Sequence, residues 1–270
     1  MTIDVDVDVH EKVNRFCGGK AEVVSLEAIR AEVAQCLHLD RLSFLIGAGC
    51  SSHIVDDVEK GIMGMWGLHE AFFEQYPDFE IAGVEARDLF DGNLEAMLGT
   101  INAVATVNGL TEVDASIEEK ASLVRGFIRS RVIKGMSGEE VSSFYRRFFQ
   151  GIVSQGRRAP INIFTTNYDL YVEQALDSLR FPYNNGFSGT YHRTFDPASY
   201  RYALVEDLRL SRDAWGRVPN YFNLYKLHGS VSWIRDEDDG VREVDYAGVT
   251  NDQTVMIYPT PLKDRSTLMT

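Results

Sequence analysis

Apolar residues first recur at helical spacing in the segment SLEAIRAEVAQCL, which begins at Ser25, a suitable N-cap. The residues that share this face are Leu26, Ile29, Val33 and Leu37. The apolar run Leu42–Ile46 follows and predicts a buried strand. Residues 1–24 alternate as DVDVDV with little apolar mass, so we expect an acidic leader that is flexible or forms an edge strand.

A long segment of helical periodicity occupies residues 61–155. It predicts helices at Leu68–Tyr76, Leu94–Val107, Ile117–Ile133 and Glu139–Val153. Ser137 and Glu140 have the spacing of a capping box and predict the start of the last helix. Because no buried strand run interrupts the helices, we interpret the segment as a helical insertion between the first two strands of a sheet.

Short apolar strands dominate the rest of the chain. Ile161–Phe164 precedes a helix at about Leu170–Leu179, and Asn223–Leu227 predicts another buried strand. Val231–Ile234 and Val241–Tyr246 predict a hairpin. Residues 181–221 are aromatic, aperiodic and rich in glycine and proline, which indicates irregular loops. Strands alternating with helices predict an α/β fold.

Three of these strands end in short polar motifs. GAGCS occupies 47–51, TTNYD occupies 165–169 and KLHG occupies 226–229. Ligand sites in open parallel sheets lie at the carboxyl ends of strands, so we expect Asn167 and His228 to face one crevice. The small residues of GAGCS allow backbone amides to approach a pyrophosphate closely.

In this order the motifs resemble those of the sirtuin superfamily, GAG-x-S, T-x-N-x-D and a histidine followed by glycine. The tyrosine within TTNYD and the KLHGSVSW form are most similar to the bacterial sirtuin-like NAD hydrolases of anti-phage defence. The motifs span Leu42 to about Trp233. The resemblance implies a Rossmann-like parallel sheet of sirtuin type over residues 25–270, with a large helical insertion at about 61–155. Such sheets usually continue with further strands, so we expect the protein to extend beyond residue 270.

The resemblance also implies the residues of the site. Asn167 offers a donor and an acceptor that could orient a water or a ribose hydroxyl, and a histidine such as His228 could accept a proton near neutral pH. The residues expected to bind NAD⁺ are Gly47, Ala48, Gly49, Ser51, Thr166, Asp169 and Gly229. For Asp169, a cap on the helix that follows is an equally good interpretation.

The cysteines bear on both metal binding and activity. Cys17, Cys36 and Cys50 are scattered without a C-x-x-C pair, whereas deacylating sirtuins hold zinc with two such pairs. We therefore expect no zinc module and no metal.

The leading hypothesis is an NAD⁺ glycohydrolase that releases nicotinamide and ADP-ribose, a defence effector that depletes NAD⁺. The alternatives are an NAD-dependent protein deacylase and a non-catalytic module that binds NAD or ADP-ribose in signalling.

Charge and hydropathy limit the partners. The chain has 270 residues and a net charge of −13, which argues against direct nucleic-acid binding. The sequence contains no apolar stretch long enough for a membrane span, and its first residues are acidic where a signal peptide is basic, so we expect a cytoplasmic protein. By resemblance, activity is controlled through a homo-oligomer or a defence partner such as a HerA-type ATPase or an Argonaute.

Overall fold

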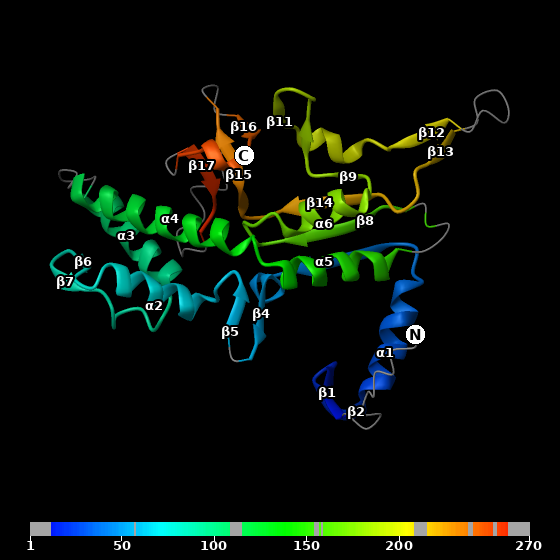
Figure 1. Ribbon diagram of the computed structural model, residues 1–270, viewed down its shortest axis with the longest axis horizontal. Helices are drawn as coiled ribbons and strands as arrows, with labels where there is room; N and C mark the ends of the chain where they lie inside the picture. Colours follow the sequence, from blue (N-terminus) through cyan, green and yellow to red (C-terminus); the bar gives the residue numbers. More distant parts are fainter. Residues whose placement is uncertain are drawn as a thin grey trace. The chain divides into compact units, whose positions relative to one another are not determined.

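The chain divides into two compact units, Met1–Leu42 and Ser43–Thr270. A computed structural model (Figure 1) describes the following residues: 12–56, 58–108, 115–153, 157, 159–207, 215–236, 240–250 and 253–258.

The first unit is a hairpin followed by a helix. Strand β1 (Lys12–Cys17) pairs antiparallel with β2 (Lys20–Ser25), and α1 spans Leu26–Leu37. The Ser25 hydroxyl accepts a hydrogen bond from the Ala28 amide at 3.1 Å, which confirms the predicted cap. The second half of the expected leader therefore has regular structure, whereas residues 1–11 lie outside the described residues.

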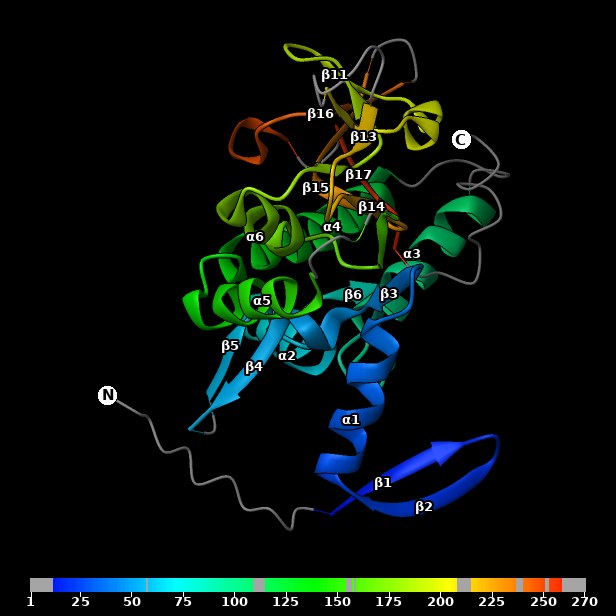
Figure 2. The same ribbon diagram turned by 90° about the vertical axis from the view of Figure 1, so that its right-hand side faces the viewer.

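The second unit contains a four-stranded sheet in the order β3-β8-β14-β9. Its strands are β3 (Leu42–Ile46), β8 (Ile161–Thr165), β9 (Tyr183–Asn184) and β14 (Phe222–Lys226). Strand β14 runs parallel to both β8 and β9, so the predicted α/β fold with a parallel sheet is confirmed. Helix α6 (Tyr171–Leu179) follows β8 and lies beside helix α5 (Glu139–Ile152) in Figures 1 and 2.

Each helix predicted between the first two sheet strands is present. They are α2 (Met65–Gln75), α3 (Leu94–Asn108), α4 (Ala115–Gly135) and α5 (Glu139–Ile152). The predicted capping box is wrong, because Gly138 is the N-cap of α5 and makes no side-chain cap bond. The Ser137 hydroxyl instead donates to the Lys134 carbonyl at 3.0 Å, so this serine completes α4.

Short strands that hydrophobic periodicity did not predict complete the unit. Four of them form two antiparallel hairpins: β4 (Ser52–Val55) pairs with β5 (Val58–Gly61), and β6 (Glu80–Ile81) pairs with β7 (Val84–Glu85). Within 181–221, expected to be irregular, the structure has β9, β10 (Phe187–Ser188), β11 (Arg193–Phe195), β12 (Val205–Asp207) and β13 (Trp215–Arg217). Strands of two or three residues are too short to show an alternating pattern.

A second sheet has the order β10-β11-β16-β15-β17. Strand β15 (Gly229–Arg235) pairs antiparallel with β16 (Val241–Glu243), which confirms the predicted hairpin. Strand β17 (Thr254–Met256) pairs with the other edge of β15. Within the described part of the chain, no helix has the length and apolar character needed to cross a membrane.

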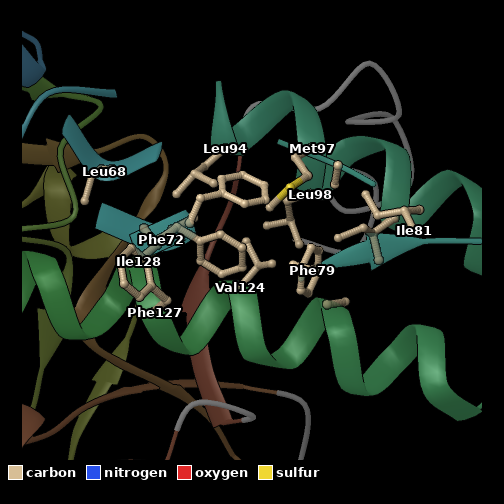
Figure 3. Close-up of a cluster of buried hydrophobic side chains, with 14 of the residues drawn as sticks. Leu68, Phe72, Phe79, Ile81, Leu94, Met97, Leu98, Val124, Phe127 and Ile128 are labelled. Carbon is tan, nitrogen blue, oxygen red and sulfur yellow. The ribbon is translucent and has the colours of Figure 1, made fainter. Parts of the chain in front are cut away.

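The main hydrophobic core lies between α2, α3 and α4 and is shown in Figure 3. On α3 the buried residues Leu94, Met97, Leu98 and Ile101 follow the i, i+3, i+4, i+7 spacing of one helix face. Val231 of β15 belongs to the same cluster. The core therefore holds the helices against the strand that follows the KLHG motif.

Phe72 of α2 provides a test of this core. Its side chain is fully buried, and its ring contacts the rings of Phe73, Phe79 and Phe127 at centroid distances of 5.1 to 5.2 Å. We expect Phe72→Ala to lower the free energy of unfolding by about 3–5 kcal/mol in urea titrations, because it removes apolar contacts and leaves a cavity. Tyr191→Ala is the control, since Tyr191 is 90% exposed and should change stability little. Equal effects of the two changes would contradict this description of the core.

Candidate functional site

A cavity of about 230 Å³ lies where the three polar motifs meet. Of the residues predicted for the site, it is lined by Ala48, Ser51, Thr166, Asn167, Asp169 and His228. Gly47, Gly49 and Gly229 do not line it. Residues that are distant in sequence thus share one cavity at the ends of neighbouring strands, as ligand-binding residues of parallel sheets commonly do.

Backbone and hydroxyl bonds join the first two motif loops. After β3 the chain turns through the 3₁₀ helix η1 (Ala48–Ser51), and after β8 it turns through residues 166–170 into α6. The Thr165 hydroxyl donates to the Ile46 carbonyl and accepts from the Asn167 amide, each at 3.0 Å. One threonine side chain therefore fixes the start of both loops relative to each other.

The Ser51 hydroxyl lies at the centre of a buried hydrogen-bond network. It donates to Asp169 Oδ2 at 2.7 Å and accepts from Asn167 Nδ2 at 2.9 Å. A third contact, at 3.0 Å, joins it to the hydroxyl of Tyr145 on α5. Because Ser51 has one proton and directs it to a carboxylate, Tyr145 is the donor in that contact. Burial raises the pKa of Tyr145 well above its usual range, so its phenol keeps this proton at neutral pH.

Both hydrogens of the Asn167 side-chain amide are bound by other groups of the protein. Nδ2 donates to Ser51 Oγ and, at 3.0 Å, to the Gly47 carbonyl. The side chain is 8% exposed and lines the cavity. With both N–H groups bound by the protein, the carbonyl oxygen Oδ1 is the atom of this amide that can meet a ligand, and it can only accept.

Asp169 has a structural role in addition to its place on the cavity wall. Oδ1 accepts from the Tyr171 amide at 3.0 Å, in the first turn of α6, and Oδ2 accepts from Ser51. Both carboxylate oxygens are therefore engaged inside the protein. This geometry favours the capping interpretation of Asp169 and leaves its direct contact with a ligand as a prediction.

His228 lies between β14 and β15 and is held by the main chain. The Leu227 amide donates to the Thr165 carbonyl, and the Ile257 amide donates to the His228 carbonyl, each at 2.8 Å. Its ring is partly buried, and its centroid is 6.4 Å from that of the Tyr168 ring. The backbone thus presents the imidazole to the cavity from a fixed position.

Gly229, predicted to bind the ligand, has a separate structural reason to be glycine. Its φ is +80°, and a Cβ at this position would lie 2.1 Å from the carbonyl oxygen of Val255. A side chain here would collide with the backbone leading into β17. The glycine therefore allows the chain to leave His228 and enter the second sheet.

Gly47 and Gly49 differ from Gly229. Among the described residues, and apart from their own chain neighbours, no heavy atom would lie within 4 Å of a Cβ at either position, and neither glycine has a left-handed φ. The fold itself therefore does not require glycine at these positions, and the open space permits a ligand to lie directly against the backbone. Gly49 lines a second cavity of about 430 Å³ together with Phe44, Phe144 and Phe148.

A buried ion pair supports the TTNYD loop. Lys226 Nζ lies 3.0 Å from Glu173 Oε1, and it also donates to the Asp169 carbonyl. Both side chains are almost completely buried. Burial raises the pKa of Glu173, and the positive charge of Lys226 opposes that rise. The lysine of KLHG thus connects β14 to the TTNYD loop and to α6.

The helical segment forms another part of the cavity wall, which sequence analysis did not anticipate. This wall comprises Ile62, Met63, Gly64, Met65, Leu68, Glu95, Ile128 and Val132. Periodicity showed which residues of these helices share a face, but it could not show that part of that face covers the motif loops. Tyr145 was missed for a similar reason, because its helical spacing predicts only a core position.

Across the described ranges, His, Cys, Asp and Glu side chains form no group of three or more that could hold a metal ion. Cys17, Cys36 and Cys50 are free and exposed.

Ser51 offers a test of the network. Ser51→Ala would leave Asp169 Oδ2 and an Asn167 N–H without their buried partner, so we expect unfolding free energy to fall by about 2–3 kcal/mol in urea titrations. Ser52→Ala is the matched control, since Ser52 Oγ donates to Glu59 in an exposed contact. That variant should lose less than about 1 kcal/mol. If Ser51→Ala lowered the unfolding free energy no more than Ser52→Ala does, the network would not contribute the stability that we expect.

Comparison with known families adds to this geometry. Residues 161–269, which are fewer than half of the chain, match the family described as the SIR2-like domain. The match contains the TTNYD and KLHG motifs, and the GAGCS turn and helices α2 to α5 precede it. Among curated proteins, none matches the chain. The chain therefore contains a SIR2-like domain, which supports a sirtuin-like family and an NAD-dependent activity in general.

Proposed function

We propose that this protein is an NAD⁺ glycohydrolase, which cleaves NAD⁺ to nicotinamide and ADP-ribose. The observation that carries the proposal is that Asn167 and His228, from separate motifs, line the same cavity within reach of the GAGCS turn. The SIR2-like domain supports NAD⁺ as the substrate. The intact pair of polar residues favours catalysis over a module that only binds NAD⁺ or ADP-ribose.

The size and chemistry of the site suit one half of the dinucleotide. A cavity of about 230 Å³ is large enough for the nicotinamide ring and part of its ribose, but too small for all of NAD⁺. The pyrophosphate would then lie along the turn at Gly47 and Gly49, where the backbone is open to a ligand. Apolar side chains from the helices would exclude bulk water from the ring.

The reaction exchanges one bond to the anomeric carbon for another. The bond between C1′ of the ribose and the ring nitrogen breaks, its electron pair goes to the nitrogen, and nicotinamide leaves uncharged. The ribose carries the positive charge until a water oxygen bonds to C1′ and one proton is released. In this proposal Asn167 Oδ1 accepts a hydrogen bond from the water or a ribose hydroxyl, and His228 accepts the released proton.

Deacylation is the second activity open to a sirtuin-like site. It uses the same cleavage but requires an acyl-lysine to enter beside the ribose. The sequence has no paired C-x-x-C motifs and lacks the arginine-containing run that follows GAG-x-S in deacylating sirtuins. We therefore place hydrolysis first, and product analysis with and without an acetyl-lysine peptide distinguishes the two.

An enzyme that consumes NAD⁺ must be restrained when it is not needed. By resemblance we propose a cytoplasmic anti-phage effector that acts by depleting NAD⁺ and is controlled by a homo-oligomer or by a partner such as a HerA-type ATPase or an Argonaute. The helices that line the cavity also carry exposed apolar side chains, among them Leu123 of α4. Contacts made on these helices could therefore alter the cavity.

His228→Ala tests the catalytic assignment. We expect NAD⁺ cleavage, followed by chromatography of nicotinamide and ADP-ribose, to slow by about 10²–10⁴-fold, because a positioned general base is lost. The matched control is His192→Ala, since His192 is exposed and does not line the cavity. If His228→Ala kept more than roughly a third of the wild-type turnover at saturating NAD⁺, the role assigned to His228 would be wrong.

Control by assembly has its own test. Leu123→Ser removes an exposed apolar side chain from the helical segment, and we expect oligomer mass by light scattering and NAD⁺ cleavage to decrease together. Leu204→Ser is the control, because Leu204 is 46% exposed and lies outside the helices. A monomeric wild-type protein with full activity at every concentration would rule out this form of control.

A further inference from the structure

The two residues proposed to act on NAD⁺ belong to different loops, so their separation depends on contacts between those loops. Asn167 lies in the turn between β8 and α6, and His228 lies between β14 and β15. Thr165 and Lys226 are the last residues of β8 and β14, and they pair in the parallel register. Lys226 is therefore two residues from the proposed base and beside the start of the loop that carries Asn167.

Two backbone carbonyls of the TTNYD loop accept hydrogen bonds from the segment that carries His228. The Tyr168 carbonyl accepts from the Val231 amide at 3.0 Å. The Asp169 carbonyl accepts from Nζ of Lys226. The first bond joins main chain to main chain, whereas the second depends on the side chain at position 226. A substitution of this lysine therefore removes one attachment between the two loops and leaves the other in place.

The ion pair made by Lys226 does not by itself explain why a lysine stands here. Its ammonium lies 3.0 Å from Glu173 Oε1, and the two side chains are only 1% and 9% exposed. Desolvation of two charges offsets their attraction, so a buried ion pair commonly contributes no more stability than apolar residues of similar volume. A hydrogen bond to the Asp169 carbonyl does require a donor, and the long side chain of lysine reaches from the strand to the loop.

We propose that Lys226 is a positioning residue for NAD⁺ cleavage, which fixes the loop that carries Asn167 relative to the turn that carries His228. The inference rests on the proposed function and deepens it, because it assigns the lysine of KLHG a part in the reaction. Lys226 does not line the cavity, so it acts through the Asp169 carbonyl and not by contact with the substrate. Displacement of a reacting group by about 1 Å can slow a reaction by about 10²-fold, so loss of this attachment should lower kcat.

Two variants separate position from stability. Lys226→Met combined with Glu173→Leu removes the donor and both charges but keeps apolar side chains of similar size, so we expect a urea midpoint close to that of the wild type. Glu173→Gln keeps the donor on Lys226 but leaves the buried ammonium without its counter-ion, so we expect a lower urea midpoint. If Lys226 acts by position, the more stable variant is the slower enzyme.

Turnover is measured at varied NAD⁺ by chromatography of nicotinamide and ADP-ribose, on protein that circular dichroism shows to be folded. We expect the kcat of the paired variant to fall about tenfold or more, with a KM within about threefold of the wild type, because the GAGCS turn is unchanged. The kcat of Glu173→Gln, the matched control, should stay within about threefold of the wild type. The paired variant decides alone if Glu173→Gln does not fold.

A paired variant with the wild-type kcat would overturn the inference and leave the proposed function standing. The inference would also fall if kcat decreased in both variants in the order of their urea midpoints, or if the paired variant did not fold, because Lys226 would then serve stability alone. Absence of NAD⁺ cleavage by the wild type would overturn the proposed function and the inference together.

Discussion

The rest of the site depends on one buried hydroxyl, that of Ser51. It joins the first motif to Asn167 and Asp169 of the second and to Tyr145 of α5, so the two strand-end loops and a helix share a single point of attachment. Each bond contributes on the order of 1 kcal/mol, but leaving the partners unsatisfied inside the protein costs more than the bonds contribute. The network is therefore satisfied as a whole or not at all, which fixes the orientation of the Asn167 amide.

The helical segment has two roles that follow from the same packing. Its core, centred on Phe72 and the buried face of α3, also includes Val231 of β15, the strand that begins at Gly229. The helices are thus attached to the strand that positions His228, and Ile128 and Val132 of α4 extend from the core to the cavity wall. A change that shifts this core would shift one wall of the cavity relative to the other, so stability and the shape of the site are connected.

Sequence patterns were sufficient for the helices and for the sheet strands β3, β8, β14 and β15, because their periodicity reflects burial directly. The six-residue strands β1 and β2 were not predicted as a hairpin, because they are largely exposed. The sequence also predicted that Asn167 and His228 face one crevice, since parallel strands end at a common edge, and both residues line the same cavity. The sequence could not show that Gly229 is needed because its backbone packs closely against Val255. A glycine in a motif looks the same in the sequence whether a ligand or a backbone atom lies against it. Nor could it show that α2, α3 and α4 cover the site, because a helix face that packs on a core and one that lines a cavity have the same pattern.

The two carboxylates of the cavity illustrate how environment assigns different roles to the same chemical group. Asp169 lies in the turn between β8 and α6, and its oxygens accept from Ser51 and from the first turn of α6, so it holds the loop in place. Glu95 lines the same cavity from α3, and its negative charge helps to raise the pKa of the neighbouring Tyr168. A carboxylate whose two oxygens are both bound by the protein has little attraction left for a substrate cation. Asp169 therefore holds the loop through contacts made within the protein, and these contacts do not depend on a bound substrate.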